Sequence, residues 1–137
     1  MYKRQISNIV DESEGWDGET IIELDNGQFY RQVEYFYHYN YSYRPKVIIE
    51  NNRAKIAGID KAVRVELIQV VKSRLIDESE GWDGETILRL ENGQVWKQVQ
   101  YYYKYQYKSR PKVVIIVSDS KAMIQGISKA VKVERVS

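Results

Sequence analysis

The chain has 137 residues, with 21 Lys and Arg against 19 Asp and Glu, so its formal charge is only +2 at pH 7. This balance argues against a polycation that binds nucleic acid or a membrane surface along its whole length. The sequence has no Cys, which excludes disulfides, Cys-based zinc sites and thiol catalysis, and it has a single His. No apolar run reaches the ~18 residues of a membrane span, and the first residues lack the apolar stretch of a signal peptide. We therefore expect a cytoplasmic protein with no cofactor, no metal and no membrane association.

The chain contains an internal duplication. Residues 11–20 return unchanged as residues 77–86, and residues 10–49 match residues 76–115 at 26 of 40 positions. After a two-residue insertion, the match continues at nine of 13 positions up to residue 134. A repeat of this length is a copied unit, because chance does not produce it. It predicts two domains, at residues 1–68 and 69–137.

Each copy begins with an acidic segment that is rich in turn formers. The first copy carries Asp11, Glu12, Glu14, Asp17 and Glu19 within nine residues, and the second copy repeats all five. These carboxylates do not have the spacing of a calcium-binding loop, and nothing around them indicates the enclosing pocket of a glycosidase pair. We expect a solvated turn with charged edges.

A β-hairpin is expected next. Thr20–Leu24 is a mostly apolar run, and Asn26-Gly27 supplies the two positive-φ positions of a type I′ turn. The strand that leaves this turn at Gln28 is expected to run on to Tyr43. Arg44-Pro45 then ends it, because proline donates no hydrogen bond to a β-ladder and restricts the residue before it.

Three more short strands are expected in the first copy, at residues 46–49, 55–59 and 62–67, with a turn at residues 51–53. No window of eleven or more residues has a helical period. So few short strands cannot bury both faces of a flat sheet, so we expect each copy to curl into a small β-barrel without exposed edges. No linker rich in Pro, Gly or Ser separates the copies, so the last strand of the first should run almost directly into the second.

Tyrosines occupy alternate positions of the longest expected strand. Side chains at i and i+2 point to one face of a strand, so the rings should form a row with a spacing of about 6.6–7 Å. The row comprises Tyr35, Tyr37, Tyr39, Tyr41 and Tyr43 in the first copy, and Tyr101, Tyr103, Tyr105 and Tyr107 in the second. The alternating residues are mostly polar, which predicts that the opposite face is largely solvated.

Two main interpretations of the tyrosine rows remain open. The rings can pack across strands against Ile and Val, with their hydroxyls at the rim of the core. They can instead form an aromatic platform for a protein or peptide, a glycan or single-stranded nucleic acid. The candidate ligand-binding residues are Tyr35, Tyr37, Tyr39, Tyr41, Tyr101, Tyr103, Tyr105 and Tyr107. Self-association through a tyrosine-rich edge is a third interpretation.

Charge is divided unevenly between the copies. Residues 1–68 carry 9 Lys and Arg against 11 Asp and Glu, a balance of −2, while residues 69–137 carry 12 against 8, a balance of +4. Four basic residues lie beside the second tyrosine row, namely Lys104, Lys108, Arg110 and Lys112. A mixture of basic and aromatic side chains is typical of grooves that bind single-stranded nucleic acid, so that is an alternative function. A purely structural or assembly role is a second alternative. The oligomeric state stays open, with a monomer favoured.

The order of motifs resembles a small uncharacterised bacterial domain. The resemblance is carried by Gly15-Trp16-Asp17-Gly18-Glu19-Thr20, then Leu24, Asn26-Gly27-Gln28, Gln32, the alternating tyrosines, Pro45-x-Val47 and Gly58. The second copy matches through Trp82, Gly93, Trp96, Gln98, Pro111 and Gly126. Tyr30 departs from the usual Trp of that domain. The resemblance covers nearly the whole chain twice and implies two tandem SH3-like small β-barrels. It brings no activity with it, because fold alone does not confer one. We therefore expect a non-enzymatic interaction module.

Overall fold

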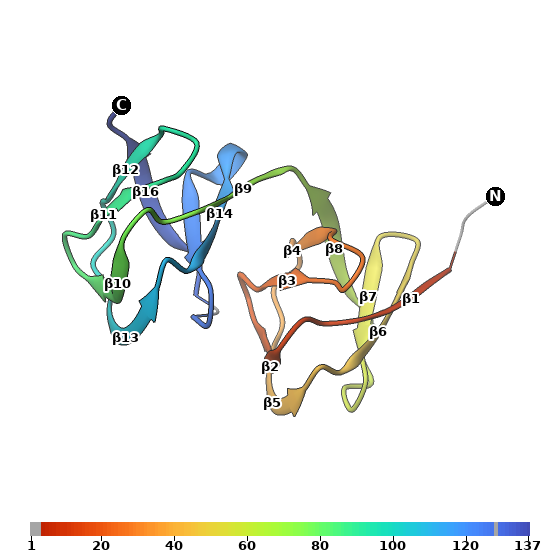
Figure 1. Ribbon diagram of the computed structural model, residues 1–137. Coiled ribbons are helices and arrows are strands. Elements are labelled where there is room, and N and C mark those ends of the chain that lie inside the picture. The colour runs from red at the N-terminus through yellow and green to blue at the C-terminus, as the bar shows by residue number, and fades with distance from the viewer. Residues whose placement is uncertain (1–3, 128) are drawn as a thin grey trace. The chain divides into compact units, whose positions relative to one another are not determined.

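The computed structural model describes residues 4–127 and 129–137. It is all-β, and the chain forms two compact units, residues 1–68 and residues 69–137 (Figure 1). The last strand of the first unit, β8 (Val63–Ile68), is separated from β9 (Val70–Arg74) by Gln69 alone. The expected direct passage from strand to strand is therefore confirmed. Among the described residues, no helix has the length and apolarity to cross a membrane.

The first unit is built on a curled six-stranded sheet. Its strand order is β1-β6-β7-β8-β4-β3, and every pairing is antiparallel. The strands are β1 (Gln5–Asn8), β3 (Ile21–Glu23), β4 (Phe29–Gln32), β6 (Lys46–Glu50), β7 (Arg53–Ile56) and β8 (Val63–Ile68). A bridge between Ile9 and Leu24 joins the ends of the two outermost strands. The sheet therefore closes on itself, and the unit is barrel-like.

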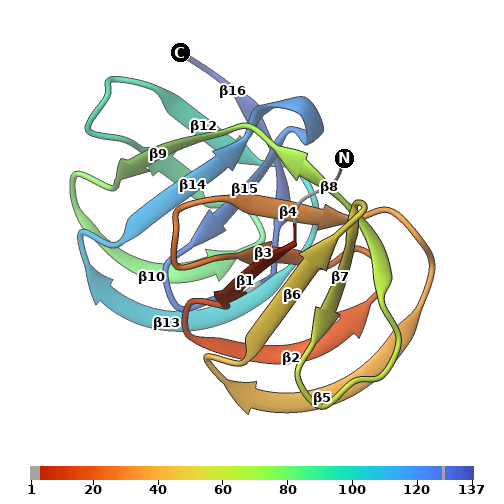
Figure 2. The ribbon, with the colours of Figure 1, turned by 90° about the vertical axis from the view of Figure 1, so that its right-hand side faces the viewer.

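Two longer strands form a separate antiparallel ribbon in the first unit. They are β2 (Glu12–Asp17) and β5 (Tyr37–Tyr43). Figure 2 shows them running side by side as a curved pair. Each is continuous in the chain with a strand of the six-stranded sheet, because β2 follows β1 and β5 leads through Pro45 into β6. We call this pair the tyrosine ribbon of the first unit.

The second unit repeats this architecture strand for strand. Its six-stranded sheet has the order β11-β12-β16-β15-β14-β9, and a bridge between Leu75 and Leu90 joins the outermost strands. The strands after β9 are β11 (Ile87–Arg89), β12 (Val95–Gln98), β14 (Lys112–Ile116), β15 (Lys121–Ile124) and β16 (Val131–Arg135). Its tyrosine ribbon is formed by β10 (Glu78–Asp83) and β13 (Tyr103–Ser109), also visible in Figure 2. A 3-10 turn, η1 (Val117–Asp119), occupies the place of the two-residue insertion.

Each unit has its own apolar core. In the first unit, Trp16 from the ribbon packs with Tyr30 and with the aliphatic side chains of the sheet. In the second unit, Trp82 and Trp96 take the equivalent places. Trp16 and Trp82 are 1% and 0% exposed. The duplication predicted from the sequence is thus a pair of similar β-barrel-like units, each folded around its own interior.

The strand expected at residues 55–59 lies instead at Arg53–Ile56, because the chain turns at residues 57–58. Two expectations about the ribbon strands were also wrong. Most of the acidic segment is a strand, β2, and the chain turns only before it, at Asp11, and after it, at residues 18–20. The expected strand from Gln28 to Tyr43 is interrupted at residues 33–36, so that β4 belongs to the six-stranded sheet and β5 to the ribbon. Both differences matter for function, because together they place the acidic strand beside the tyrosine-rich strand.

Candidate interaction surface

The tyrosine rows face solvent in both units. Along β5, the exposed fractions of the four tyrosine side chains lie between 52% for Tyr41 and 66% for Tyr43, and Tyr35, just before the strand, is 85% exposed. The second unit gives the same values within a few per cent, from 53% at Tyr107 to 84% at Tyr101. The interpretation that these rings pack in the core is therefore wrong. We call this side of each ribbon its outer face.

The other side of the ribbon is the half-buried one. Phe36 packs against the core of the first unit, and Tyr102 packs against the core of the second. Asn40 and Gln106 are only partly exposed, and Gln106 donates a hydrogen bond to the backbone carbonyl of Gln125. The face opposite the tyrosines, which was expected to be largely solvated, is therefore the half-buried inner face of the ribbon. In the second unit, the Gln106 hydrogen bond joins this face to the segment that follows β15.

A buried glutamine sets the course of the chain from sheet to ribbon. The side-chain oxygen of Gln32 accepts hydrogen bonds from the backbone N–H groups of Gly18 and Thr20, at 2.9 and 3.2 Å. Its side-chain nitrogen donates to the backbone carbonyls of Glu34 and Phe36, both at 2.9 Å. This amide therefore joins the end of β2 to the segment that precedes β5. It is only 4% exposed, so each of these groups would be costly to leave unpaired.

The second unit repeats this arrangement with Gln98. Its oxygen accepts from the N–H groups of Gly84 and Thr86, and its nitrogen donates to the carbonyls of Gln100 and Tyr102. The interruption between the sheet strand and the ribbon strand is therefore a built feature of the fold. It directs the following strand so that its odd-numbered residues, the tyrosines, point outward.

Carboxylates share the outer face with the tyrosines. Residues directly opposite each other in an antiparallel pair lie on the same face. Glu12 is opposite Tyr43, and Asp17 is opposite Tyr37, so one carboxylate stands near each end of the row in the first unit. In the second unit Glu78 is opposite Ser109, and Asp83 is opposite Tyr103.

Two tyrosines interact directly with these carboxylates. A hydrogen bond to Glu12 is the main cause that raises the pKa of Tyr41 above its ordinary value. A hydrogen bond to Glu78 raises the pKa of Tyr107 in the same way. Both effects arise because a nearby negative charge disfavours the phenolate and because the hydrogen bond requires the protonated hydroxyl. Tyrosine and carboxylate therefore form one chemical surface in each unit.

The four basic residues beside the second row do not converge on the outer face. Lys104 and Lys108 lie opposite Trp82 and Ser79, which places them on the inner side of the ribbon. Arg110 forms an ion pair with Glu91, and Lys112 lies on β14 opposite Arg74. The alternation of a β-strand thus separates Lys104 and Lys108 from the tyrosines that alternate with them.

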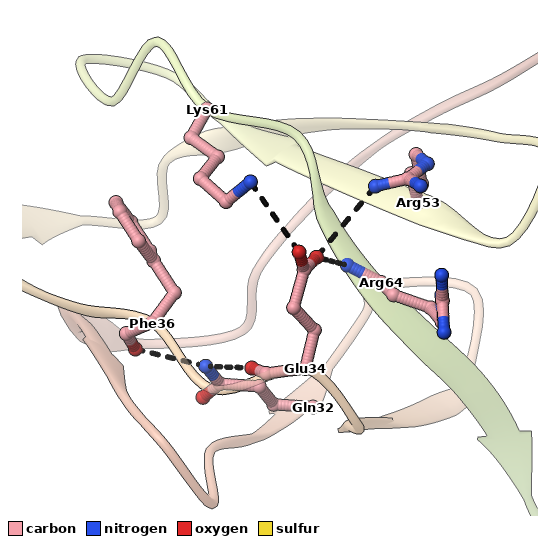
Figure 3. Close-up of polar contacts among 6 residues, drawn as sticks. All are labelled: Gln32, Glu34, Phe36, Arg53, Lys61 and Arg64. Atoms are coloured by element: carbon pink, nitrogen blue, oxygen red, sulfur yellow. Dashed lines mark hydrogen bonds and ion pairs between the residues drawn. The ribbon is translucent and has the colours of Figure 1, made fainter.

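A cluster of charges around Glu34 fastens the segment between sheet and ribbon in the first unit (Figure 3). The Glu34 carboxylate accepts a hydrogen bond from the backbone N–H of Arg64 and lies 3.4 Å from the Lys61 ammonium and 3.6 Å from the Arg53 guanidinium. The hydrogen bond from Arg64, assisted by Lys61 and Arg53, lowers the pKa of Glu34. In the second unit the neutral Gln100 accepts the equivalent hydrogen bond, from Lys132 N–H. This cluster supports the ribbon and lies apart from its outer face.

Sequence reasoning found the tyrosines and missed the carboxylates that stand beside them. Glu12, Asp17, Glu78 and Asp83 lay in a segment predicted as a turn, because Glu, Asp and Gly are disfavoured in strands. The available signal was the alternation of Glu12 and Glu14 around Ser13, repeated unchanged in the second copy.

No protein-family model, curated protein or solved structure matches this chain in the comparisons made with each. The likeness to SH3-like barrels stays a prediction from the sequence. The case for function therefore depends on the surface itself.

Proposed function

We propose that the protein is a non-catalytic interaction module that binds a peptide segment of a protein through the outer faces of its tyrosine ribbons. The observation that carries this proposal is the exposure of nine tyrosines in two rows, each at least 52% exposed. Large contiguous exposed aromatic patches are unusual on soluble proteins and mark interaction sites. Tyrosine suits such a surface because its ring offers wide contact area with few rotatable bonds, and its hydroxyl stays solvated until it is paired.

The two units keep the same tyrosines on the outer face, which indicates that these residues are retained for a reason. All four positions of the second row keep the tyrosine of the first, whereas the inner face changes from His38 to Lys104 and from Ser42 to Lys108. The structure removes core packing as a reason for keeping the rings, since they are exposed. Ligand binding is a reason that remains.

The direct test is selection of binders from a random 12-residue peptide library on the immobilised full chain. The selected peptides are then measured against a variant with Tyr37→Ser, Tyr39→Ser, Tyr103→Ser and Tyr105→Ser. We expect this variant to lose binding at least tenfold while its far-ultraviolet circular dichroism stays that of the wild type. The fold should survive because the four rings contribute little buried area.

A matched control removes exposed apolar side chains elsewhere. Ile6, Leu67, Val117 and Val136 are 52–58% exposed and lie outside the ribbons. Their simultaneous replacement by Ser should leave peptide binding within threefold of the wild type. Absence of any selected binder, or equal loss in the two variants, would contradict the proposal.

The alternatives predict other outcomes for the same protein. Binding of single-stranded nucleic acid through Lys104, Lys108, Arg110 and Lys112 predicts oligonucleotide affinity that strengthens as salt is lowered. An assembly role predicts self-association in sedimentation. We expect a monomer and no oligonucleotide binding at low salt, because carboxylates share the outer face with the rings.

A further inference from the structure

We propose that the peptide bound by each ribbon is extended and cationic, with Lys or Arg at alternate positions. This inference rests on the proposed function and names the ligand class of the same face. The charges of the face, their retention between the units and the spacing of the rings lead to it.

The charged groups on the outer face are all acidic. Every residue of β2, β5, β10 and β13 is described, and none of the outward positions in these four strands holds Lys or Arg. The charged residues directly opposite a row tyrosine are Glu12, Asp17 and Asp83, while Glu78 bonds to Tyr107 from the neighbouring position. Glu80 also lies near enough to Tyr107 to raise its pKa by charge. A ligand on this face meets aromatic rings and negative charge together.

The outer face is acidic in both units, although the two units differ in net charge. The first unit has a balance of −2 and the second a balance of +4. The lysines gained in the second ribbon, Lys104 and Lys108, both stand on its inner side. On the outer side of the paired strands the single replacement is Tyr43 by Ser109, which introduces no charge. The face is therefore anionic in both units, although the second unit as a whole is basic.

This combination of groups recognises cations. An ammonium or guanidinium group is attracted to the face of a tyrosine ring, and the attraction grows when a carboxylate stands beside it. A neutral sugar would gain no net charge attraction from the carboxylates, and phosphate groups would be repelled by them. The chemistry therefore favours Lys or Arg side chains as the groups that touch the face.

The spacing of the rings determines the spacing of the cations. Rings at i and i+2 repeat about every 6.6–7 Å along the strand, and an extended peptide lying along the row presents its own side chains on one side at the same interval. Alternate residues of the ligand can then each meet one ring. The four tyrosines of β5, Tyr37 to Tyr43, accommodate four such residues, and the three of β13, Tyr103 to Tyr107, accommodate three.

Three synthetic 12-residue peptides test this proposal against the full chain by fluorescence anisotropy. The alternating basic peptide repeats the Lys-Ser dipeptide, the block basic peptide has all its lysines before all its serines at the same composition, and the alternating acidic peptide repeats Glu-Ser. We expect the alternating basic peptide to bind at least tenfold more tightly than the acidic peptide and at least threefold more tightly than the block peptide. Its binding should weaken as salt is raised, because exposed charges are screened.

A charge variant identifies the surface responsible. Glu12→Gln, Asp17→Asn, Glu78→Gln and Asp83→Asn together should weaken binding of the alternating basic peptide at least tenfold. The Asp17 and Asp83 side chains also accept hydrogen bonds within their turns, from the N–H groups of Glu19 and Glu85, and asparagine keeps that acceptor. The control neutralises four acidic residues outside the ribbons, Asp25, Glu50, Asp60 and Glu134, and should weaken binding less than threefold. It changes the net charge equally, so it separates a local effect from a general one.

The outcomes distinguish this inference from the proposed function. Selected library peptides that bind the tyrosine face but lack Lys and Arg, together with no binding of the alternating basic peptide, would overturn the cationic ligand and leave the interaction module intact. No binding by that peptide or by any library peptide would overturn both. Equal affinity for the alternating and block basic peptides would contradict the ring-spacing argument, and unchanged binding by the charge variant would contradict the role of the carboxylates.

Discussion

A Cβ atom added to Gly81 would lie 2.0 Å from the backbone carbonyl oxygen of Lys104, on the opposite strand of the ribbon. The equivalent distance in the first unit, from Gly15 to the carbonyl oxygen of His38, is 2.1 Å. Both glycines have φ above +90° and lie where the register between the ribbon strands shifts. The ribbon can hold its acidic strand against its tyrosine strand only because these positions carry no side chain.

Replacement of Gly81 by Ala should therefore destabilise the second unit by more than about 3 kcal/mol, because backbone strain adds to a clash with backbone atoms that cannot move aside. Gly93→Ala is the matched control. Gly93 has φ +90° and no atom within 4 Å of an added Cβ, so its replacement should cost only about 1 kcal/mol of left-handed strain. Chemical unfolding followed through the Trp82 indole NMR signal measures the stability of the second unit in both variants. Equal losses would show that the close approach to Lys104 has no effect.

Replacement of Gln32 by Leu should destabilise the first unit by about 3 kcal/mol or more. The change leaves two backbone N–H groups and two carbonyl groups around the buried site without their partner. Gln98→Leu should act in the same way on the second unit. Denaturation monitored by the Trp16 and Trp82 indole signals assigns each loss to its unit. A loss below about 1 kcal/mol would mean that water replaces the amide and that the segment before the ribbon is not held by it.

Acid should weaken the first unit through Glu34 and have no equivalent effect in the second. The pKa of Glu34 is lowered from its ordinary value of 4.5, chiefly by the hydrogen bond from the Arg64 N–H. A carboxyl whose pKa is lower in the folded state stabilises the fold above its unfolded pKa, and this contribution is lost as pH falls through the folded pKa. Glu34→Gln, which copies Gln100 of the second unit, should reduce the loss of stability below about pH 4.5. The loss of stability of the first unit in acid is followed through the Trp16 indole NMR signal in the wild type and in the Glu34→Gln variant. Identical unfolding curves for the two proteins would rule out the contribution of Glu34.

Tyr41 and Tyr107 should lose their protons at a higher pH than an ordinary tyrosine. Hydrogen bonds to Glu12 and Glu78 raise their pKa values. Glu12→Gln should lower the pKa of Tyr41, because it removes the negative charge that opposes the phenolate. Asp17→Asn, at the other end of the row, is the control and should leave the pKa of Tyr41 unchanged. NMR titration of labelled tyrosines measures each ring. If the pKa of Tyr41 changed only in the control variant, the interaction between Tyr41 and Glu12 would be contradicted.

Local turn chemistry made much of the fold predictable from the sequence. Asn26-Gly27 gave the hairpin of β3 and β4, and Arg44-Pro45 gave the end of β5, because both motifs restrict the backbone wherever they occur. The repeat then made the prediction of two similar units secure. The interruption after Gln32 was not predictable, since no Gly or Pro marks it, and the side chain that causes it works through contacts with a distant segment.

The candidate surface was half predictable. Alternation alone placed Tyr35 to Tyr43 on one face, but it is silent on which face turns to solvent. That choice depends on Phe36 and Trp16, which fill the core from the inner side of the ribbon. The carboxylates were missed for a related reason. A strand as polar as β2 forms because its Trp is buried and its glycine permits close pairing with β5, and both are tertiary effects.

Chemical nitration of tyrosine, with each site identified by mass spectrometry, tests most directly whether the outer faces of the ribbons are open to solvent and available to a ligand. We predict rapid nitration of the nine row tyrosines, and slow nitration of Tyr30, which is 8% exposed in the core. Bound peptide should then protect the rows. Rows that react as slowly as Tyr30 in the free, monomeric protein would contradict the account.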